Sequence, residues 1–462
     1  YHARSLYQEG EEVFRGAAAA LAANATSDAG VDTLSASLRI AQAFFLNLLH
    51  RYDDAIAVVR TVLAQRPSHE LSPIVAEAQL EWGVALSLQS EPDEALARLS
   101  VVLELTQRLN LPVVEARALH GMFRVLIPKG KVEEATAVLE RARHLYQQVG
   151  YRLGEGFVLR SLGYVARRRN QYVQALAYWE QAVRIYQEME DHLRVISIWQ
   201  HLGDVFEALG DLGRAYRYYR DAYNHRDEVQ DLRHAAHTVD GFARLMARLG
   251  EYEQACAYGQ QALAEQRRLR DQAGVVETLC TLGAVFWQMG DAATALRHYL
   301  EALALSRSAG ARIYEGLAQL GIGQTYAALG QLDEAVAACR HALTIQRELG
   351  QQQSVLETLS ELARIALMRN CLDEALTLVT ELQTGLAISE LHGARDPLRV
   401  YWVCYQVLSA KRDPHASQWL TTAYRELQTQ AATIDDARLH ESFLTNVVIN
   451  RAIAAAYLLR ST

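Results

Sequence analysis

The sequence predicts an all-α fold, an α-solenoid superhelix of about ten helix-turn-helix repeats with capping helices at its ends. Three observations predict it: alanine recurs every forty residues through nine copies, Gly or Asn recurs at the same interval between them, and only 7 of the 462 residues are proline. A long fixed period indicates stacked helical hairpins, because a single hairpin cannot bury its own apolar face and its neighbours supply the missing partner.

Each repeat is expected to consist of a first helix, a tight turn and a second helix. The second helix carries the repeating alanine, at Ala55, Ala95, Ala135, Ala175, Ala215, Ala255, Ala295, Ala335 and Ala375. Twelve residues earlier, on the first helix, stands a small residue in all copies except the third, which has Phe123. The turn between them carries Gly or Asn, which tolerate the left-handed backbone at a helix end, at Gly130, Asn170, Gly210, Gly250, Gly290, Gly330 and Asn370.

The two ends of the chain differ from the repeats. Residues 1–30 predict an N-terminal capping helix or the end of a preceding domain, and residues 31–390 predict nine repeats of forty residues. After residue 382 the frame loosens through a segment with two glycines and a proline. Residues 391–462 are therefore expected to form a degenerate tenth repeat and a C-terminal capping helix, because the last apolar face needs a cover.

Composition and charge exclude several classes of protein. The formal net charge of −8 argues against nonspecific affinity for nucleic acid or for an anionic membrane. Charged or polar residues interrupt the apolar stretches well before 18 positions, so no membrane span is expected. The 5 cysteines include no CxxC pair, which predicts neither a disulfide framework nor a zinc site and favours a reducing, cytoplasmic location.

The sequence contains no recognisable catalytic or cofactor-binding motif. Its only Gly-Lys pair, Gly130-Lys131, lacks the earlier glycine and the following hydroxyl residue of a phosphate-binding loop. The pair His440-Glu441 is not followed by a histidine at the spacing of a zinc-protease helix. We therefore expect no catalytic residue, no metal site and no cofactor in this segment.

The residues of the fourth repeat resemble the tetratricopeptide repeat. They follow the frame Gly163-x11-Ala175-x3-Trp179-x2-Ala182, and the same frame recurs from Gly283. That family usually has a period of 34 residues, and the six extra residues here would lengthen the helices, as in its forty-residue subclass. The resemblance implies a right-handed superhelix that binds protein partners.

The last sixty or so residues resemble a narrower group. Tyr401-Trp-Val-Cys-Tyr405 and the run from Ile434 to Val447 are similar to the C-terminal end of bacterial signalling ATPases of the STAND class. In those proteins a nucleotide-binding switch precedes a long repeat array that acts as sensor. The resemblance implies an upstream nucleotide-binding module in the same polypeptide, and self-association only through the full-length protein, if at all.

Helical phase separates two faces on the first helix of each repeat. Positions six and three residues before the small residue, and one, four and five after it, fall together away from the packing positions. In an array of this kind that second face lines the inner, concave surface. The candidate ligand-binding residues on it are Arg117, His120, Arg124, Phe157, Arg160, Tyr164, Arg167, Asp204, Asp240, Arg244, Glu277, Trp287 and Gln324.

This face predicts a groove for an extended acidic or polar peptide, or for a protein segment, held by arginine forks and ring stacking. The alternative is a solvated face that is rich in arginine because lysine is rare throughout the chain. Cys280 falls on the same face, where its thiol can be accessible.

We interpret the sequence as a noncatalytic sensor that binds a peptide or protein trigger and regulates an attached nucleotide-dependent switch. The alternative function is a constitutive scaffold that links protein partners without switching. A nucleic-acid-binding repeat is disfavoured by the net charge, and a self-contained enzyme by the lack of a catalytic constellation.

Overall fold

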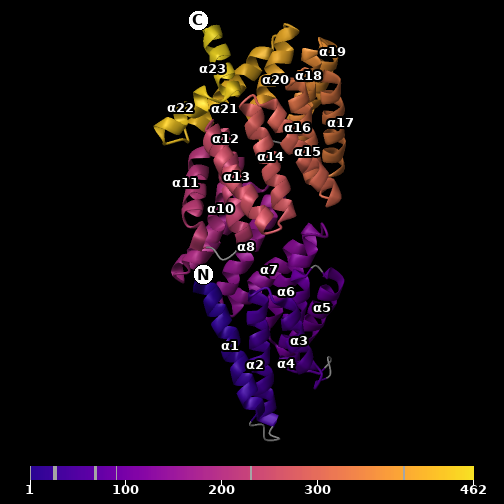
Figure 1. The fold of residues 1–462 in the computed structure, drawn as a ribbon, viewed down its shortest axis with the longest axis vertical. Coiled ribbons are helices and arrows are strands. Elements are labelled where there is room, and N and C mark those ends of the chain that lie inside the picture. The colour runs from indigo at the N-terminus through magenta and orange to yellow at the C-terminus, as the bar shows by residue number, and fades with distance from the viewer. Residues whose placement is uncertain are drawn as a thin grey trace. The chain divides into compact units, whose positions relative to one another are not determined.

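The computed structural model describes residues 2–23, 29–66, 70–89, 91–228, 232–388 and 391–461. Across these residues every regular element is a helix, and consecutive helices pack in pairs, so the predicted all-α repeat solenoid is confirmed (Figure 1). The chain divides into two compact units, unit 1 (Tyr1–Val195) and unit 2 (Ile196–Thr462). Each unit is described by itself below.

Unit 1 begins with α1, which packs against α2, and continues with three further pairs, α4 with α5, α6 with α7 and α8 with α9. Its helices are α1 (His2–Ala23), α2 (Ala29–Leu48), α3 (Tyr52–Leu63), α4 (Pro73–Leu88), α5 (Pro92–Leu109), α6 (Pro112–Leu126), α7 (Val132–Gln148), α8 (Arg152–Arg168) and α9 (Tyr172–Glu188). The boundary between the units falls within α10 (His192–Ala208).

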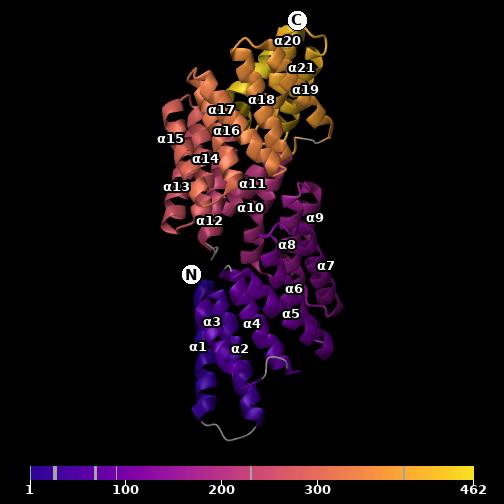
Figure 2. The ribbon, with the colours of Figure 1, turned by 90° about the vertical axis from the view of Figure 1, so that its right-hand side faces the viewer.

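Unit 2 continues the same alternation, and Figure 2 shows its helices following one another in chain order from α12 to α19. They are α11 (Leu212–Asn224), the short 3-10 helix η1 (Arg226–Glu228), α12 (Leu232–Arg248), α13 (Tyr252–Arg268), α14 (Gln272–Gln288), α15 (Ala292–Ser308), α16 (Arg312–Ala328), α17 (Leu332–Glu348), α18 (Gln352–Met368), α19 (Leu372–Ile388), α20 (Pro397–Ala410), α21 (Ala416–Ala431), α22 (Ala437–Thr445) and α23 (Val448–Ser461).

The predicted turn residues end the first helices as expected. All seven have positive φ, from 58° at Asn170 to 84° at Gly290, which is the left-handed region that Gly and Asn adopt most readily. A second series, offset by twenty residues and including Asn110 and Gly150, ends second helices in the same way. Helix ends and packing positions therefore both recur every forty residues.

The core follows the two small positions of each repeat. All nine repeating alanines are fully buried. In the fourth repeat Gly163 lies under Trp179, and a Cβ added there would stand 2.3 Å from the indole nitrogen. The missing side chain lets α8 and α9 approach closely enough for the indole to fill the space between them.

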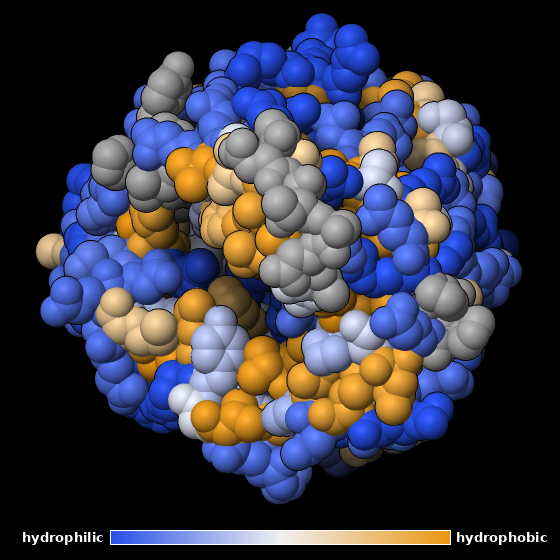
Figure 3. All heavy atoms as spheres, turned by 90° about the horizontal axis from the view of Figure 1, so that it is seen from below, coloured by the Kyte–Doolittle hydropathy of each residue, from blue (hydrophilic) through white to orange (hydrophobic). Residues whose placement is uncertain are grey.

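Apolar side chains also reach the surface. On the face viewed in Figure 3, hydrophobic residues lie in several places among hydrophilic ones. Exposed large apolar side chains in unit 1 include Val13, Leu34, Leu71 and Val173. Scattered apolar residues of this kind are normal on a folded protein and do not by themselves mark a binding site.

The end of the chain folds back on its own unit. Helix α20 packs against α18 and α19 and pairs with α21. Beyond α21, Thr433 Oγ1 accepts a hydrogen bond from the main-chain N–H of Gly213, at 3.3 Å. On α22, Arg438 pairs with Glu251, with 2.6 Å between Nη1 and Oε2. We call residues 391–446 the C-terminal segment.

Among the described residues, no single helix has both the length and the apolar composition needed to cross a membrane. The pair α22 and α23 meets both criteria when the two are taken together, although they meet at 77°.

Candidate ligand-binding faces

The candidate residues of unit 1 come from two neighbouring first helices. Helix α6 carries Arg117, His120 and Arg124, and α8 carries Phe157, Arg160, Tyr164 and Arg167. Spacings of three and four residues place each set along one side of its helix. We call these seven residues the ligand face of unit 1.

The centre of this face is a cluster formed by His120 and the positively charged Arg124 and Arg160. The surrounding protein atoms and the neighbouring charge of Arg160 lower the pKa of Arg124, although its side chain still reaches solvent. Among the described residues, no carboxylate lies within ion-pair distance of the guanidinium of Arg124 or Arg160. Two like charges held together without a counter-ion favour an anion placed between them.

His120 is neutral in this cluster. Burial lowers its pKa well below the usual value, and the charges of Arg124 and Arg160 lower it further. Its Nε2 lies 2.8 Å from Ser161 Oγ, while the Ser161 hydroxyl is 3.2 Å from the main-chain oxygen of Phe157. Both contacts are satisfied when the hydroxyl donates to Phe157 and Nε2–H donates to the hydroxyl.

The aromatic residues of the face already have cationic neighbours. Arg167 and Arg168 lie 5.9 and 6.0 Å from the centre of the Tyr164 ring, and Arg168 Nη1 donates to the Tyr164 hydroxyl at 3.3 Å. The guanidinium of Arg194 covers Phe157 at 4.7 Å. The rings of Tyr164 and Phe157 are therefore already in contact with arginines of the protein itself.

Arg117 differs from the other arginines of the face because it is paired. Its Nη2 lies 2.5 Å from Oε1 of Glu81, whose side chain is almost completely buried. Arg117 thus compensates a buried carboxylate on α4, whereas Arg124 and Arg160 have no such partner in the part of the chain that the structure describes.

In unit 2 the candidate residues lie on α10, α12, α14 and α16, and we call Asp204, Asp240, Arg244, Glu277, Trp287 and Gln324 the ligand face of unit 2. Arg244 is the centre of an ion-pair network here. Its Nη2 lies 3.0 Å from both Asp204 Oδ1 and Glu207 Oε2, and it donates to the Tyr219 hydroxyl at 2.9 Å. Such a guanidinium has most of its donors satisfied within the protein.

Asp240 is buried beside this network and is only 1% exposed. Burial, and next the nearby charge of Glu277, raise its pKa to about 6, although Arg244 lies 3.9 Å away. Within the described residues its Oδ1 has no hydrogen-bond partner. Asp240 is therefore a buried member of the network and not a surface ligand group.

The remaining residues of this face also have partners outside the network. The Glu277 carboxylate accepts a hydrogen bond from the Tyr314 hydroxyl at 3.2 Å. Trp287 lies under the guanidinium of Arg399, 4.7 Å from its ring centre. Gln324 is half-buried on α16.

The expectation of an accessible thiol at Cys280 is wrong. This side chain is 1% exposed, and burial raises its pKa to about 12. Helical phase groups Cys280 with the candidate face, but its side chain packs in the hydrophobic core with Leu279 and Tyr299.

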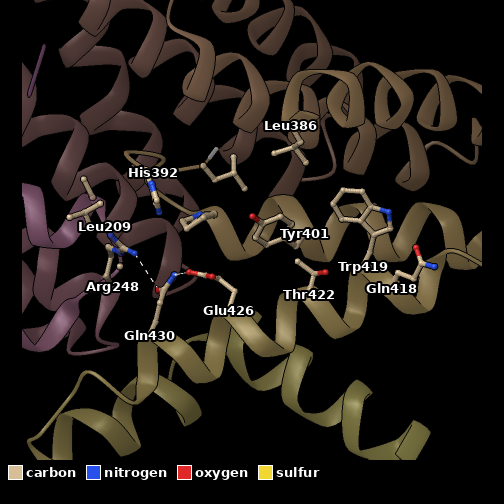
Figure 4. Close-up of a pocket in the computed structure, with 14 residues that line it drawn as sticks. Leu209, Arg248, Leu386, His392, Tyr401, Gln418, Trp419, Thr422, Glu426 and Gln430 are labelled. Carbon is tan, nitrogen blue, oxygen red and sulfur yellow. Dashed lines mark hydrogen bonds between the residues drawn. The ribbon is translucent and has the colours of Figure 1, made fainter. Parts of the chain in front are cut away.

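A cavity of about 490 Å³ lies between the C-terminal segment and the ends of α10 and α12. Tyr401 and Trp419 line it from α20 and α21, and Leu209 and Arg248 line it from the repeats (Figure 4). Arg248 Nη2 reaches Gln430 Oε1 at 3.5 Å. The helices of the C-terminal segment thus bridge to the repeats without filling all the space beneath them.

Sequence reasoning missed the residues that cover the ligand face of unit 2. Arg395 and Arg399 lie outside the forty-residue frame, so the helical phase that selected the other candidates does not apply to them. The only signal was the break in the frame itself, between Gly385 and Pro397.

Comparison with protein families identifies the repeats. Residues 114–188, 165–228 and 234–308 match a tetratricopeptide repeat family, and residues 318–349 match a second family of the same name. The chain carries tetratricopeptide repeats. The forty-residue tetratricopeptide frame seen from Gly163 onward agrees with these matches.

Solved structures share the tetratricopeptide-repeat fold at low sequence identity. Aspartyl phosphate phosphatase F from Bacillus subtilis is 15% identical, with a TM-score of 0.52 over 76% of this chain and 94% of the other. NprR in complex with its cognate peptide NprX is 12% identical, with a TM-score of 0.50 over 83% and 99%. Identities of this size show the fold alone. No curated protein matches the chain.

A third solved structure is a signal transduction ATPase with numerous domains, a STAND protein with a tetratricopeptide repeat sensor, from Pyrococcus horikoshii. It is 13% identical, with a TM-score of 0.49 over 88% of this chain and 56% of the other. This chain therefore spans little more than half the length of that protein.

Proposed function

We propose that the chain is a noncatalytic ligand-binding array that holds an acidic peptide or protein segment on the ligand face of unit 1 and thereby regulates an attached nucleotide-dependent switch. One observation carries the proposal. Arg124 and Arg160 lie beside a neutral His120, and within the described part of the chain neither has a carboxylate partner.

The chemistry of this cluster favours a carboxylate over a neutral ligand. Hydrogen bonds that involve an ionised group contribute about 1.5–3 kcal/mol each, roughly twice as much as neutral ones. A bound carboxylate would also relieve the repulsion between the two guanidiniums. Arg167 and Arg168 beside Tyr164 extend the positive charge along α8 and suit an extended ligand.

Two comparisons support the proposal. NprR, which shares this fold, was crystallised with a peptide. The residues from Tyr401 to Tyr405 and from Ile434 to Val447 are similar to the C-terminal end of STAND-class ATPases. In that class the array is a sensor, and a sensor transmits a signal only when its ligand binds the two states of the switch with different affinity.

Binding can be tested with matched charge reversals and an array of immobilised decapeptides of graded acidity. The test variant is Arg124→Glu/Arg160→Glu. The control is Arg108→Glu/Arg184→Glu, which makes the same change of charge at two exposed arginines on the second helices α5 and α9. We expect the wild type and the control to retain acidic peptides and the test variant to lose at least tenfold in affinity. Equal retention by all three proteins would reject the site.

The regulatory part needs the full-length polypeptide. If the array is a sensor, the retained peptide changes the rate of nucleotide hydrolysis, and the Arg124→Glu/Arg160→Glu variant does not respond. A constitutive scaffold, the alternative function, binds the same peptide with an unchanged hydrolysis rate.

A further inference from the structure

The cavity of about 490 Å³ in unit 2 is lined by a polar row and by two aromatic rings (Figure 4). The polar row belongs to α21 and recurs at intervals of four residues, which places its side chains along one side of the helix. It consists of Gln418, Thr422, Glu426 and Gln430. The rings are those of Tyr401 and Trp419, whose centres lie 6.1 Å apart.

Packing fixes the walls of this cavity. Leu391, Ala394 and the buried residues of α20 belong to a hydrophobic core that they share with α16, α17, α18 and α19, and Tyr401 and Trp419 pack against that core. Beyond α21, a Cβ added at Gly213 would stand 1.7 Å from the main-chain oxygen of Thr433, so the chain is closely packed there. The cavity is therefore preformed, and its volume lies within the range of about 300–1,000 Å³ that is typical of small-molecule sites.

Glu426 supplies the negative charge of the cavity. Of the described residues that line it, Glu426 alone is acidic. Its Oε1 accepts a hydrogen bond from Gln430 Nε2 at 2.9 Å, but within the described chain no arginine, lysine or histidine lies within ion-pair distance of the carboxylate. The side chain is partly buried. A carboxylate that is partly withdrawn from water and lacks a counter-ion favours a cation beside it.

The basic residue of the cavity, Arg248, is already compensated. Its Nη1 donates to the main-chain oxygen of Glu207 at 2.8 Å and lies 3.7 Å from Glu207 Oε1. Its Nη2 reaches Gln430 Oε1 at 3.5 Å. An anionic ligand at Arg248 would compete with Glu207, whereas a cationic ligand at Glu426 would meet a charge without an ionic partner. His392, which also lines the cavity, is exposed.

Trp419 adds a second feature that suits an organic cation. Aromatic faces attract cations and also pack against apolar carbon atoms. Arginines cover other tryptophans of the chain, as Arg98 covers Trp82 at 3.7 Å and Arg399 covers Trp287 at 4.7 Å. Among the described residues, no cation of the protein covers the ring of Trp419.

We propose that this cavity binds a small organic amine, whose ammonium group pairs with Glu426 and whose apolar or aromatic body packs on Tyr401 and Trp419. Thr422 lies between Glu426 and Trp419 along α21, where its hydroxyl can accept a hydrogen bond from the ammonium. The repeats and the C-terminal segment both line the cavity, so a bound amine stabilises their junction. The site does not depend on the ligand face of unit 1, and either can fail without the other.

The probes are phenethylamine, tryptamine and hexylamine. Phenethyl alcohol and hydrocinnamate serve as neutral and anionic analogues of the first. The test variant Glu426→Gln removes the charge and keeps an oxygen that accepts the hydrogen bond from Gln430. Glu441→Gln is the matched control, because it makes the same change at an exposed residue of α22 that does not line the cavity. A second test variant, Trp419→Leu, removes the ring.

Isothermal titration calorimetry should show that the wild type and Glu441→Gln bind at least one of the amines, and bind phenethylamine at least tenfold more tightly than either analogue. Glu426→Gln should lose at least tenfold in affinity for the amine, and Trp419→Leu at least threefold. A saturating amine should also raise the Tm of the wild type.

The proposal fails if none of the three amines binds the wild type, or if both test variants bind them as well as the wild type does. It also fails if hydrocinnamate binds more tightly than phenethylamine, because the cavity would then take an anion at Arg248. Helical circular dichroism of each variant checks that a loss of binding is not a loss of fold, and Trp419→Leu decides the outcome should Glu426→Gln not fold.

Discussion

The indole Nε1 of Trp179 donates a hydrogen bond to the main-chain oxygen of Arg160, at 3.0 Å, across the space that Gly163 leaves between α8 and α9. This contact joins the packing of the fourth repeat to its candidate site. The indole is fully buried, and the carbonyl that it fixes belongs to Arg160, which has no carboxylate partner among the described residues. The tetratricopeptide frame therefore fixes the backbone from which the Arg160 side chain projects.

Gly163→Ala should destabilise unit 1. The new Cβ would lie 2.3 Å from Trp179 Nε1, and both the ring and its hydrogen bond would have to shift. Overpacking of this kind costs about 1–3 kcal/mol. Urea unfolding followed by tryptophan fluorescence would measure the loss. Gly16→Ala, in open space on α1, should show no loss, and an equal loss in both variants would mean that the close approach is unimportant.

Arginines of the two faces should respond to truncation in opposite ways. Arg244→Ala leaves Asp204 and Glu207 without their partner and should lower the free energy of unfolding by about 3–5 kcal/mol. Arg124→Ala removes one of two repelling charges and should leave the free energy unchanged or raise it by about 0.5 kcal/mol. Thermal unfolding of the two variants tests this, and a large loss for Arg124→Ala would reveal a structural role.

Acid should weaken unit 1 through His120. Burial, Arg124 and Arg160 hold the pKa of His120 in the folded state well below 6.5. As the pH falls through 6.5, the unfolded chain therefore binds a proton at this residue that the folded chain does not bind. Stability from this residue is present above pH 6.5 and is lost as the pH falls below it. His120→Gln should flatten the dependence of stability on pH between about 6.5 and 5. An unchanged slope in the variant would show that His120 is protonated when folded.

Much of the fold follows from the sequence because its determinants are local and periodic. The alanine on each second helix and the Gly or Asn at each turn act within one hairpin. The forty-residue period therefore predicts each hairpin without information about contacts between distant repeats. Helical phase likewise placed Arg124 and Arg160 on neighbouring helices, in two consecutive repeats. The neutral state of His120 comes first from its burial and then from the two arginines near it.

The occupancy of the second face could not be predicted in this way. It depends on contacts between residues far apart in sequence, such as Gly393 with Ala208, and on a stretch that leaves the frame. Phase assigns Trp287 and Glu277 to a face but does not say what lies on it. The contact of Arg244 with Tyr219 could not be predicted from phase either. Tyr219 lies on the second helix α11, whereas phase was applied only to first helices.

Glu357 should give unit 2 the opposite dependence on pH from His120. Burial raises its pKa to about 7, although the N–H of Asp396 and the charge of Arg395 act against this. The unfolded chain releases the proton near pH 4.3, so between about pH 4.3 and 7 the folded state holds a proton that the unfolded state has lost. Stability from this group therefore falls as the pH rises through that window.

The variant Glu357→Gln isolates this effect, because the amide oxygen can still accept the hydrogen bond from Asp396. Relative to the variant, the wild type should lose on the order of 1 kcal/mol or more of stability between pH 4.5 and 7, measured by urea unfolding. Equal slopes in the two proteins would show that the folded state does not raise the pKa of Glu357.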